Sequence, residues 1–111
     1  MGTFGMNNLL LTDSGCCGYL SSVVTDLPLS PDKMLPEERC LYKRNGSCGL
    51  CLKHCVGDAL GAEGFDRVSC YAMVMRTEKY YSQSGIHFVN ATDACGKCAA
   101  GLPCSTGNPA K

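Results

Sequence analysis

The number and spacing of the cysteines constrain this chain more than any other feature of its sequence. Ten of the 111 residues are cysteine, whereas Leu, Ile, Val and Phe together number only 22. A chain with so few large apolar side chains lies at the low edge of what can fold by burying a hydrophobic core alone. The cysteines therefore have to supply part of the stability, through disulfides or through bound metal.

The N-terminal residues indicate which of these two uses applies. The opening stretch MGTFGMNNLLLTDSG contains no basic residue and no apolar run longer than three leucines, so it does not resemble a secretory signal. We therefore expect a cytoplasmic protein, because clustered cysteines in a reducing compartment usually bind metal or do redox work. A disulfide framework is the alternative if an export signal has been lost. Zero net charge and the lack of a long apolar run predict no membrane span and no general attraction for nucleic acid.

Local patterns predict a hairpin and a connection in the first half of the chain. The runs 8–12 and 19–25 carry Leu, Val and Tyr residues and are separated by turn-forming residues. This pattern predicts a β-hairpin. Three prolines, an asparagine and a glycine make residues 28–47 an expected irregular connection.

The second half is expected to be mainly helical. Asp66 can cap a helix in which Val68, Tyr71, Ala72 and Met75 recur at helical spacing and predict one apolar face. Shorter helices are expected over residues 49–60 and 92–100. The tail, 105–111, is small and polar and is expected to fray.

Eight of the ten cysteines form a pattern suited to iron–sulfur clusters. Eight is the number of thiolates that two [4Fe–4S] clusters need, and soft sulfur is their preferred ligand. The pattern is Cys40, then Cys48-x2-Cys51-x3-Cys55, then Cys70, then Cys95-x2-Cys98-x5-Cys104.

The spacing also predicts how these cysteines divide. The two members of a C-x2-C step reach the same cluster from one tight turn, so Cys48 stays with Cys51 and Cys95 with Cys98. The x3 step opens a helix that turns Cys55 toward the other cluster, as in bacterial-type two-cluster proteins. The predicted ligands are Cys40, Cys48, Cys51 and Cys104 for cluster 1, and Cys55, Cys70, Cys95 and Cys98 for cluster 2.

Zinc is the main alternative metal. The pairs Cys48/Cys51 and Cys95/Cys98 could form one four-thiolate site in a zinc-stabilised interaction module. In zinc ribbons, however, about 15–20 residues separate such pairs. Here residues 52–94 intervene, and four cysteines would have no role.

Three cysteines also have simpler interpretations. Cys70 by itself would be a buried core thiol more often than a ligand. Cys16 and Cys17 are adjacent and are expected to be an exposed or half-buried thiol pair in a turn. A redox dithiol is the alternative, although adjacent cysteines form a disulfide only with strain.

Landmarks with and without cysteine, taken together, give the chain a specific resemblance. They are Gly2-Thr3-Phe4-Gly5-Met6-Asn7-Asn8-Leu9-Leu10, Thr25-Asp26-Leu27-Pro28-Leu29-Ser30-Pro31-Asp32, the run from Cys48 to Cys55, and Cys95-Gly-Lys-Cys98. In this order the chain, from residue 2 to about residue 104, resembles the C-terminal part of the epoxyqueuosine reductase family. That resemblance implies two [4Fe–4S] clusters, a cobalamin cofactor and reduction of epoxyqueuosine to queuosine in tRNA.

The departures from the family pattern limit what it implies. Thr3 and Met6 replace a Trp and a Lys, and Val56 replaces the proline after the cysteine run. Asn45 stands at the position of the first ligand, for which Cys40 is the nearest substitute. The family's upstream portion, with most of its cobalamin pocket, has no counterpart here. We therefore expect a fragment or a stand-alone descendant rather than a complete reductase.

The resemblance implies two domains. Residues 1–36 would correspond to the end of the cobalamin-binding domain, with Gly5 and Asn7 facing cobalamin, and residues 37–111 to the double-cluster domain. The expected fold class is α+β, a small β-hairpin followed by a ferredoxin-like, mainly helical two-[4Fe–4S]-cluster domain. A stand-alone ferredoxin-type electron carrier is the alternative function.

The sequence also predicts binding partners and residues that would set the reduction potential of the clusters. An electron donor protein is implied, and a positive stretch without acidic residues is a candidate contact for tRNA phosphates; a solvated loop face is the simpler interpretation. The basic residues are Arg39, Lys43, Arg44 and Lys53. Cluster potential would be set by amides at Gly49 and Gly96 and by burial under Val56, Leu60 and Met73.

Overall fold

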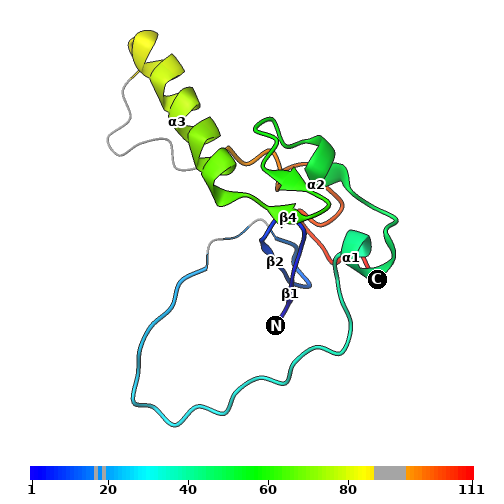
Figure 1. The fold of residues 1–111 in the computed structure, drawn as a ribbon. Helices are drawn as coiled ribbons and strands as arrows, with labels where there is room; N and C mark the ends of the chain where they lie inside the picture. Colours follow the sequence, from blue (N-terminus) through cyan, green and yellow to red (C-terminus); the bar gives the residue numbers. More distant parts are fainter. Residues whose placement is uncertain (17, 19, 87–94) are drawn as a thin grey trace.

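The computed structural model describes residues 1–16, 18, 20–86 and 95–111. Its elements are short except for the last helix, as Figure 1 shows. They are β1 (Thr3–Phe4), β2 (Leu10–Leu11), α1 (Leu41–Asn45), α2 (Leu50–Lys53), β3 (Leu60–Gly61), β4 (Gly64–Phe65) and α3 (Arg67–Gln83). Two antiparallel two-stranded sheets and these helices confirm a small α+β protein.

The N-terminal hairpin forms from different strands than the sequence predicted. β1 pairs with β2, so that Phe4 lies opposite Leu10. Asn8 makes the turn between them with a left-handed φ of 58°. The predicted partner run, 19–25, is not a strand over its described residues 20–25, and Val23 is 85% exposed. That prediction was wrong because a nearer backbone partner was available upstream.

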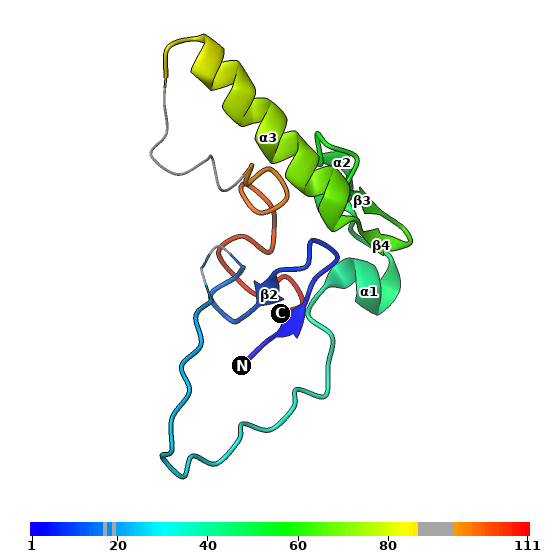
Figure 2. The ribbon, with the colours of Figure 1, turned by 60° about the vertical axis from the view of Figure 1, so that its left-hand side comes forward.

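Residues 20–38 form an extended arm without helix or strand. Both ribbon views show this arm running away from the body of the molecule in a wide loop (Figures 1 and 2). The prediction of an irregular connection is confirmed here but was too long, because α1 lies within 28–47. α1 ends at Gly46, whose φ of 73° lets its N–H return to the carbonyl of Tyr42 at 2.9 Å.

The helix predicted over 49–60 is a single turn, α2. A turn at Gly57 and Asp58, which has a φ of 50°, ends the helical path. The chain then enters β3, which pairs with β4 and contacts α2. This reversal brings Leu60 into the core, where it is buried.

α3 begins where the sequence predicted. The carboxylate of Asp66 accepts hydrogen bonds from the Val68 N–H at 2.8 Å and the Ser69 hydroxyl at 2.6 Å, which satisfies donors of the first turn. The predicted apolar face does not point inward, however, since Val68 is 78% exposed. The half-buried stripe instead contains Cys70 and Met73.

Gly57 explains why α3 turns the side with Cys70 and Met73 toward the body of the molecule. A Cβ at position 57 would lie only 2.9 Å from the Cβ of Met73, so the helix approaches the Gly57 turn closely through that stripe. The helix then runs away from the body of the molecule toward its C-terminal end (Figure 2). No helix among the described residues has the length and apolar character needed to cross a membrane.

The core consists of two small clusters in which cysteines are members. One contains Leu11, Cys16 and Cys40, and the other contains Cys51, Leu60 and Leu102. Met6 and Cys104 pack against both clusters. The sulfur-bearing side chains are thus part of what holds the N-terminal, central and C-terminal segments together.

The C-terminal tail is docked, so the prediction that it frays was wrong. Ser105 is buried, and the Lys111 ammonium lies 3.0 Å from the Asp13 carboxylate. The prediction of a helix at 92–100 lies partly outside the described residues. Its described part, residues 95–100, ends in turns, with the Ala100 N–H bonded to the Gly96 carbonyl at 3.0 Å.

Candidate metal centre

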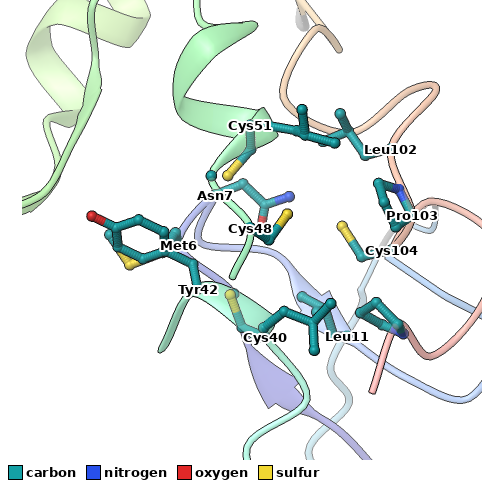
Figure 3. Close-up of a pocket in the computed structure, with 15 residues that line it drawn as sticks. Met6, Asn7, Leu11, Cys40, Tyr42, Cys48, Cys51, Leu102, Pro103 and Cys104 are labelled. Carbon is teal, nitrogen blue, oxygen red and sulfur yellow. The ribbon is translucent and has the colours of Figure 1, made fainter. Parts of the chain in front are cut away.

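One pocket brings together the four cysteines predicted for cluster 1. Cys40 precedes α1, Cys48 precedes α2, Cys51 lies within α2, and Cys104 comes from the C-terminal segment. Figure 3 shows their sulfur atoms directed toward the same space. Three separate segments of the chain therefore contribute thiols to one site.

The remaining wall of this pocket is almost entirely apolar. The space between the lining residues, including the part open to solvent, is about 390 Å³. Side chains that line it with the cysteines include Met6, Asn7, Leu11, Leu41, Tyr42, Leu50, Leu102, Pro103 and Pro109. Sulfur atoms in such surroundings have few competing water contacts, which suits a soft metal centre whose potential depends on solvent exposure.

The local structure at Asn45 explains why Cys40, and not residue 45, lines the pocket. The Asn45 carboxamide oxygen accepts hydrogen bonds from the N–H and hydroxyl of Ser47, at 3.0 and 2.6 Å. Asn45 thus forms a local turn and does not line the pocket. Cys40, five residues earlier, is buried and does line it.

Two of the thiols in this pocket, Cys51 and Cys104, have raised pKa values. Burial raises the pKa of Cys51, and negative charge on Cys40 and Cys48 raises it further. Burial raises the pKa of Cys104 to about 12, with additional contributions from Cys16 and Cys51. Four thiolates would repel one another here, and a bound cationic centre would remove that penalty.

The other four cysteines form a second group. Burial raises the pKa of Cys70, and Cys55 and Cys95 raise it further. Burial likewise raises the pKa of Cys98, with contributions from Cys70, Cys55 and Cys95. These four therefore lie within electrostatic reach of one another near the start of α3, although Cys95 is exposed.

One amide-to-sulfur hydrogen bond was missed by the sequence reasoning. The Ala59 N–H donates to the Cys55 sulfur at 3.2 Å, whereas the predicted donors were Gly49 and Gly96. The turn at Gly57 and Asp58 carries the chain back so that Ala59 faces this sulfur. Gly57 and the short length of that turn were the available signal.

The burial predicted around the clusters is correct in part. Leu60 is buried and Met73 is half-buried, but Val56 is 55% exposed. The prediction for Val56 was wrong because the turn that follows Cys55 points this residue away from the core. Leu60 and the cysteines around it provide the shared wall instead.

The side chains of the described residues do not form a ready-made site for a single metal ion. Among the described residues, no group of three Cys, His, Asp or Glu side chains is placed to hold one metal ion. The two C-x2-C pairs also belong to different groups, one in the pocket and one near α3. A four-iron cluster makes a different demand, because each of its four thiolates binds a different iron atom.

The sequence also did not predict that Cys16 lies next to this pocket. Its prediction as an exposed or half-buried thiol was wrong, since only 4% of it is exposed. Its sulfur lies 4.0 Å from the sulfur of Cys104. A Cβ at Gly15 would collide with the Ser105 carbonyl, so the glycine allows this close approach; Cys17 lies outside the described residues.

Asn7 and Gly5 are both buried and in close contact with other residues. The buried Asn7 amide donates to the Cys98 carbonyl at 2.8 Å, and its oxygen accepts from the Leu9 N–H at 3.3 Å. A Cβ at Gly5 would come within 2.7 Å of both Asn7 and Leu11. These residues tie the hairpin to the second cysteine group, and their contact with cobalamin stays a prediction.

The four basic residues do not present one open surface. Arg39 is 9% exposed and pairs with Asp13 at 3.2 Å, and Lys43 donates to the Phe4 carbonyl at 2.6 Å. Arg44 lies 3.4 Å from Glu37. Lys53 is exposed at the end of α2. Three of the four therefore connect segments of the fold, and a tRNA contact stays a prediction.

Comparison with known proteins adds no relative. No family model, no curated protein and no solved structure matches the chain.

Proposed function

We propose that this chain is an iron–sulfur electron-transfer protein, or the electron-transfer part of a larger protein, that holds two [4Fe–4S] clusters. The observation that carries the proposal is the pocket in which Cys40, Cys48, Cys51 and Cys104 meet. Cys48 and Cys51 are close to each other because they are near in sequence. Cys40 and Cys104 lie further away along the chain, so the fold has to bring them beside this pair. The surrounding region would be a ferredoxin-like cluster domain.

The donor set fits such clusters in number and in chemistry. Each group supplies four thiols, which is the complement of one cubane. Cys55 and Cys98 of one group and Cys104 of the other pack against the same core cluster of Cys51, Leu60 and Leu102. Two centres held by these groups would therefore be neighbours, as electron transfer between them requires.

The resemblance to epoxyqueuosine reductase supports a particular use for the electrons. In that interpretation they would pass to cobalamin for the reduction of epoxyqueuosine in tRNA. The chain's own contribution would be to bind the clusters and exclude water from them. A stand-alone carrier is distinguished by a cobalamin titration, in which the cofactor's absorption would not change.

Anaerobic reconstitution with ferrous iron and sulfide tests the proposal. We expect about eight irons and eight sulfides per chain, a brown colour with absorption near about 400 nm, and two paramagnetic signals after reduction. Replacing Cys17, which belongs to neither group, with serine is the matched control and should keep the full complement. A colourless protein that binds one zinc and no iron would contradict the proposal.

A further inference from the structure

We propose that Cys16 and Cys104 form a redox-active thiol pair, which a hydroperoxide converts to a disulfide when the pocket holds no cluster. The disulfide itself depends only on the fold. Its effect on iron binding rests on the proposed function, because Cys104 is one of the predicted ligands of cluster 1.

The two cysteines are already placed for bond formation. Their sulfurs are 4.0 Å apart, and the Cys16 N–H donates to the Cys104 carbonyl at 2.8 Å. A disulfide needs Cα atoms about 4.4–6.8 Å apart, and the backbone hydrogen bond holds the two residues side by side. Side-chain rotation can therefore close the remaining gap of roughly 2 Å to the disulfide length.

The segments that carry the pair are held against each other. Gly15 lies directly against the Ser105 carbonyl, where a side chain would collide. The Ser105 hydroxyl in turn accepts from the Leu102 N–H at 2.7 Å and donates to the Ala99 carbonyl. The approach of Cys16 to Cys104 is thus built into the backbone on both sides.

Access differs between the two thiols in a useful way. Cys104 is half-buried and lines the pocket, so a small oxidant can reach it through that opening. Cys16 lies behind it in the core cluster with Leu11 and Cys40. One thiol is therefore placed to react first and the other to resolve the product.

The chemistry balances with one hydroperoxide molecule. The Cys104 thiol loses its proton as its sulfur attacks an oxygen of hydrogen peroxide, the O–O bond breaks, and that proton joins the departing hydroxide, so that a sulfenic acid and one water form. The Cys16 thiol then attacks that sulfur, the S–O bond breaks, and its proton leaves with the hydroxide as a second water. The sulfur pair loses two electrons, the peroxide gains them, and a dithiol reductant reverses the change.

Formation of this disulfide would remove one ligand from the pocket without touching the second group. It would also keep Cys104 from advancing to the irreversible sulfinic state. The adjacent pair Cys16 and Cys17 could form a disulfide only with strain. The main competing product is instead a disulfide between Cys48 and Cys51, because both line the pocket.

The decisive experiment maps disulfides in the reduced, iron-free full chain after treatment with one equivalent of hydrogen peroxide. After alkylation and trypsin digestion, we expect the peptide 1–33 to be joined to 98–111, with fragment spectra placing the bond between Cys16 and Cys104. In Cys16→Ser this product should vanish and sulfinic acid at Cys104 should increase several-fold. Cys17→Ser should behave as wild type. A predominant Cys48–Cys51 or Cys16–Cys17 bond would overturn the proposal.

Iron binding separates this proposal from the proposed function. Oxidised wild type should incorporate about half the iron of the reduced protein, about four atoms instead of eight, and dithiothreitol should restore the rest. Full incorporation by the mapped disulfide form would overturn the effect on the pocket. If even the reduced protein takes up no iron, the proposed function fails, while the disulfide map still decides the thiol pair.

Discussion

The two cysteine groups differ most in what surrounds them. Cys40, Cys48, Cys51 and Cys104 line a pocket whose walls come from the N-terminal hairpin, α1, α2 and the C-terminal segment. Cys55, Cys70, Cys95 and Cys98 lie near the start of α3, and Cys95 is exposed. Contacts between distant segments enclose the first group, in which Cys40 and Cys51 are buried, whereas in the part of the chain that the structure describes no cysteine of the second group is buried.

The largest effect should follow removal of iron from the reconstituted protein. The described core contains only seven buried apolar or cysteine residues, three of them cysteines, so cluster binding should be strongly coupled to folding. Chelation should lower the helical circular dichroism and the thermal midpoint together. Unchanged values for both would show that the fold does not depend on the clusters.

Single ligand replacements should separate the two groups. Cys104→Ser should remove about four irons and one paramagnetic signal, and Cys70→Ser should remove the other four and the other signal. Cys40→Ser should lose the first cluster or convert it to a three-iron form, as measured by iron content and electron paramagnetic resonance. If Cys40→Ser keeps about eight irons and both signals, Cys40 is not a ligand.

A substitution in the core should reduce the free energy of unfolding much more than a substitution in the arm. Leu11 is 1% exposed and forms part of the pocket wall, so Leu11→Ala should reduce the free energy of unfolding by roughly 2–5 kcal/mol. Val23→Ala in the arm should change it by less than about 0.5 kcal/mol. Urea titration of both variants measures the difference, and equal losses would mean that the arm is packed in solution.

The smallest effect should come from the N-cap of α3. Asp66→Ala removes the acceptor for Val68 and Ser69 and should lower the thermal midpoint by a few degrees, with fraying of the first turn. Asp26→Ala in the arm is the matched control and should leave the midpoint unchanged. Because Cys70 lies one turn from the cap, a change in the second paramagnetic signal alone would reveal local coupling.

Several features were predictable because their causes are local. Asp66 begins α3 through contacts with the next three residues. Cys48 and Cys51, the two ends of one C-x2-C step, line the same pocket. These features depend on bonds between near neighbours, and the residue types alone indicate them.

What the sequence by itself determined was therefore the cysteine count, the proximity of Cys48 to Cys51 and the capped start of α3. The tertiary structure alone decided that β2 pairs with β1, that the stripe of Cys70 and Met73 faces inward, and that Cys16 meets Cys104. Each of these outcomes depends on which surface another segment leaves available. A pattern of local residue types carries no information about that choice until the chain is packed.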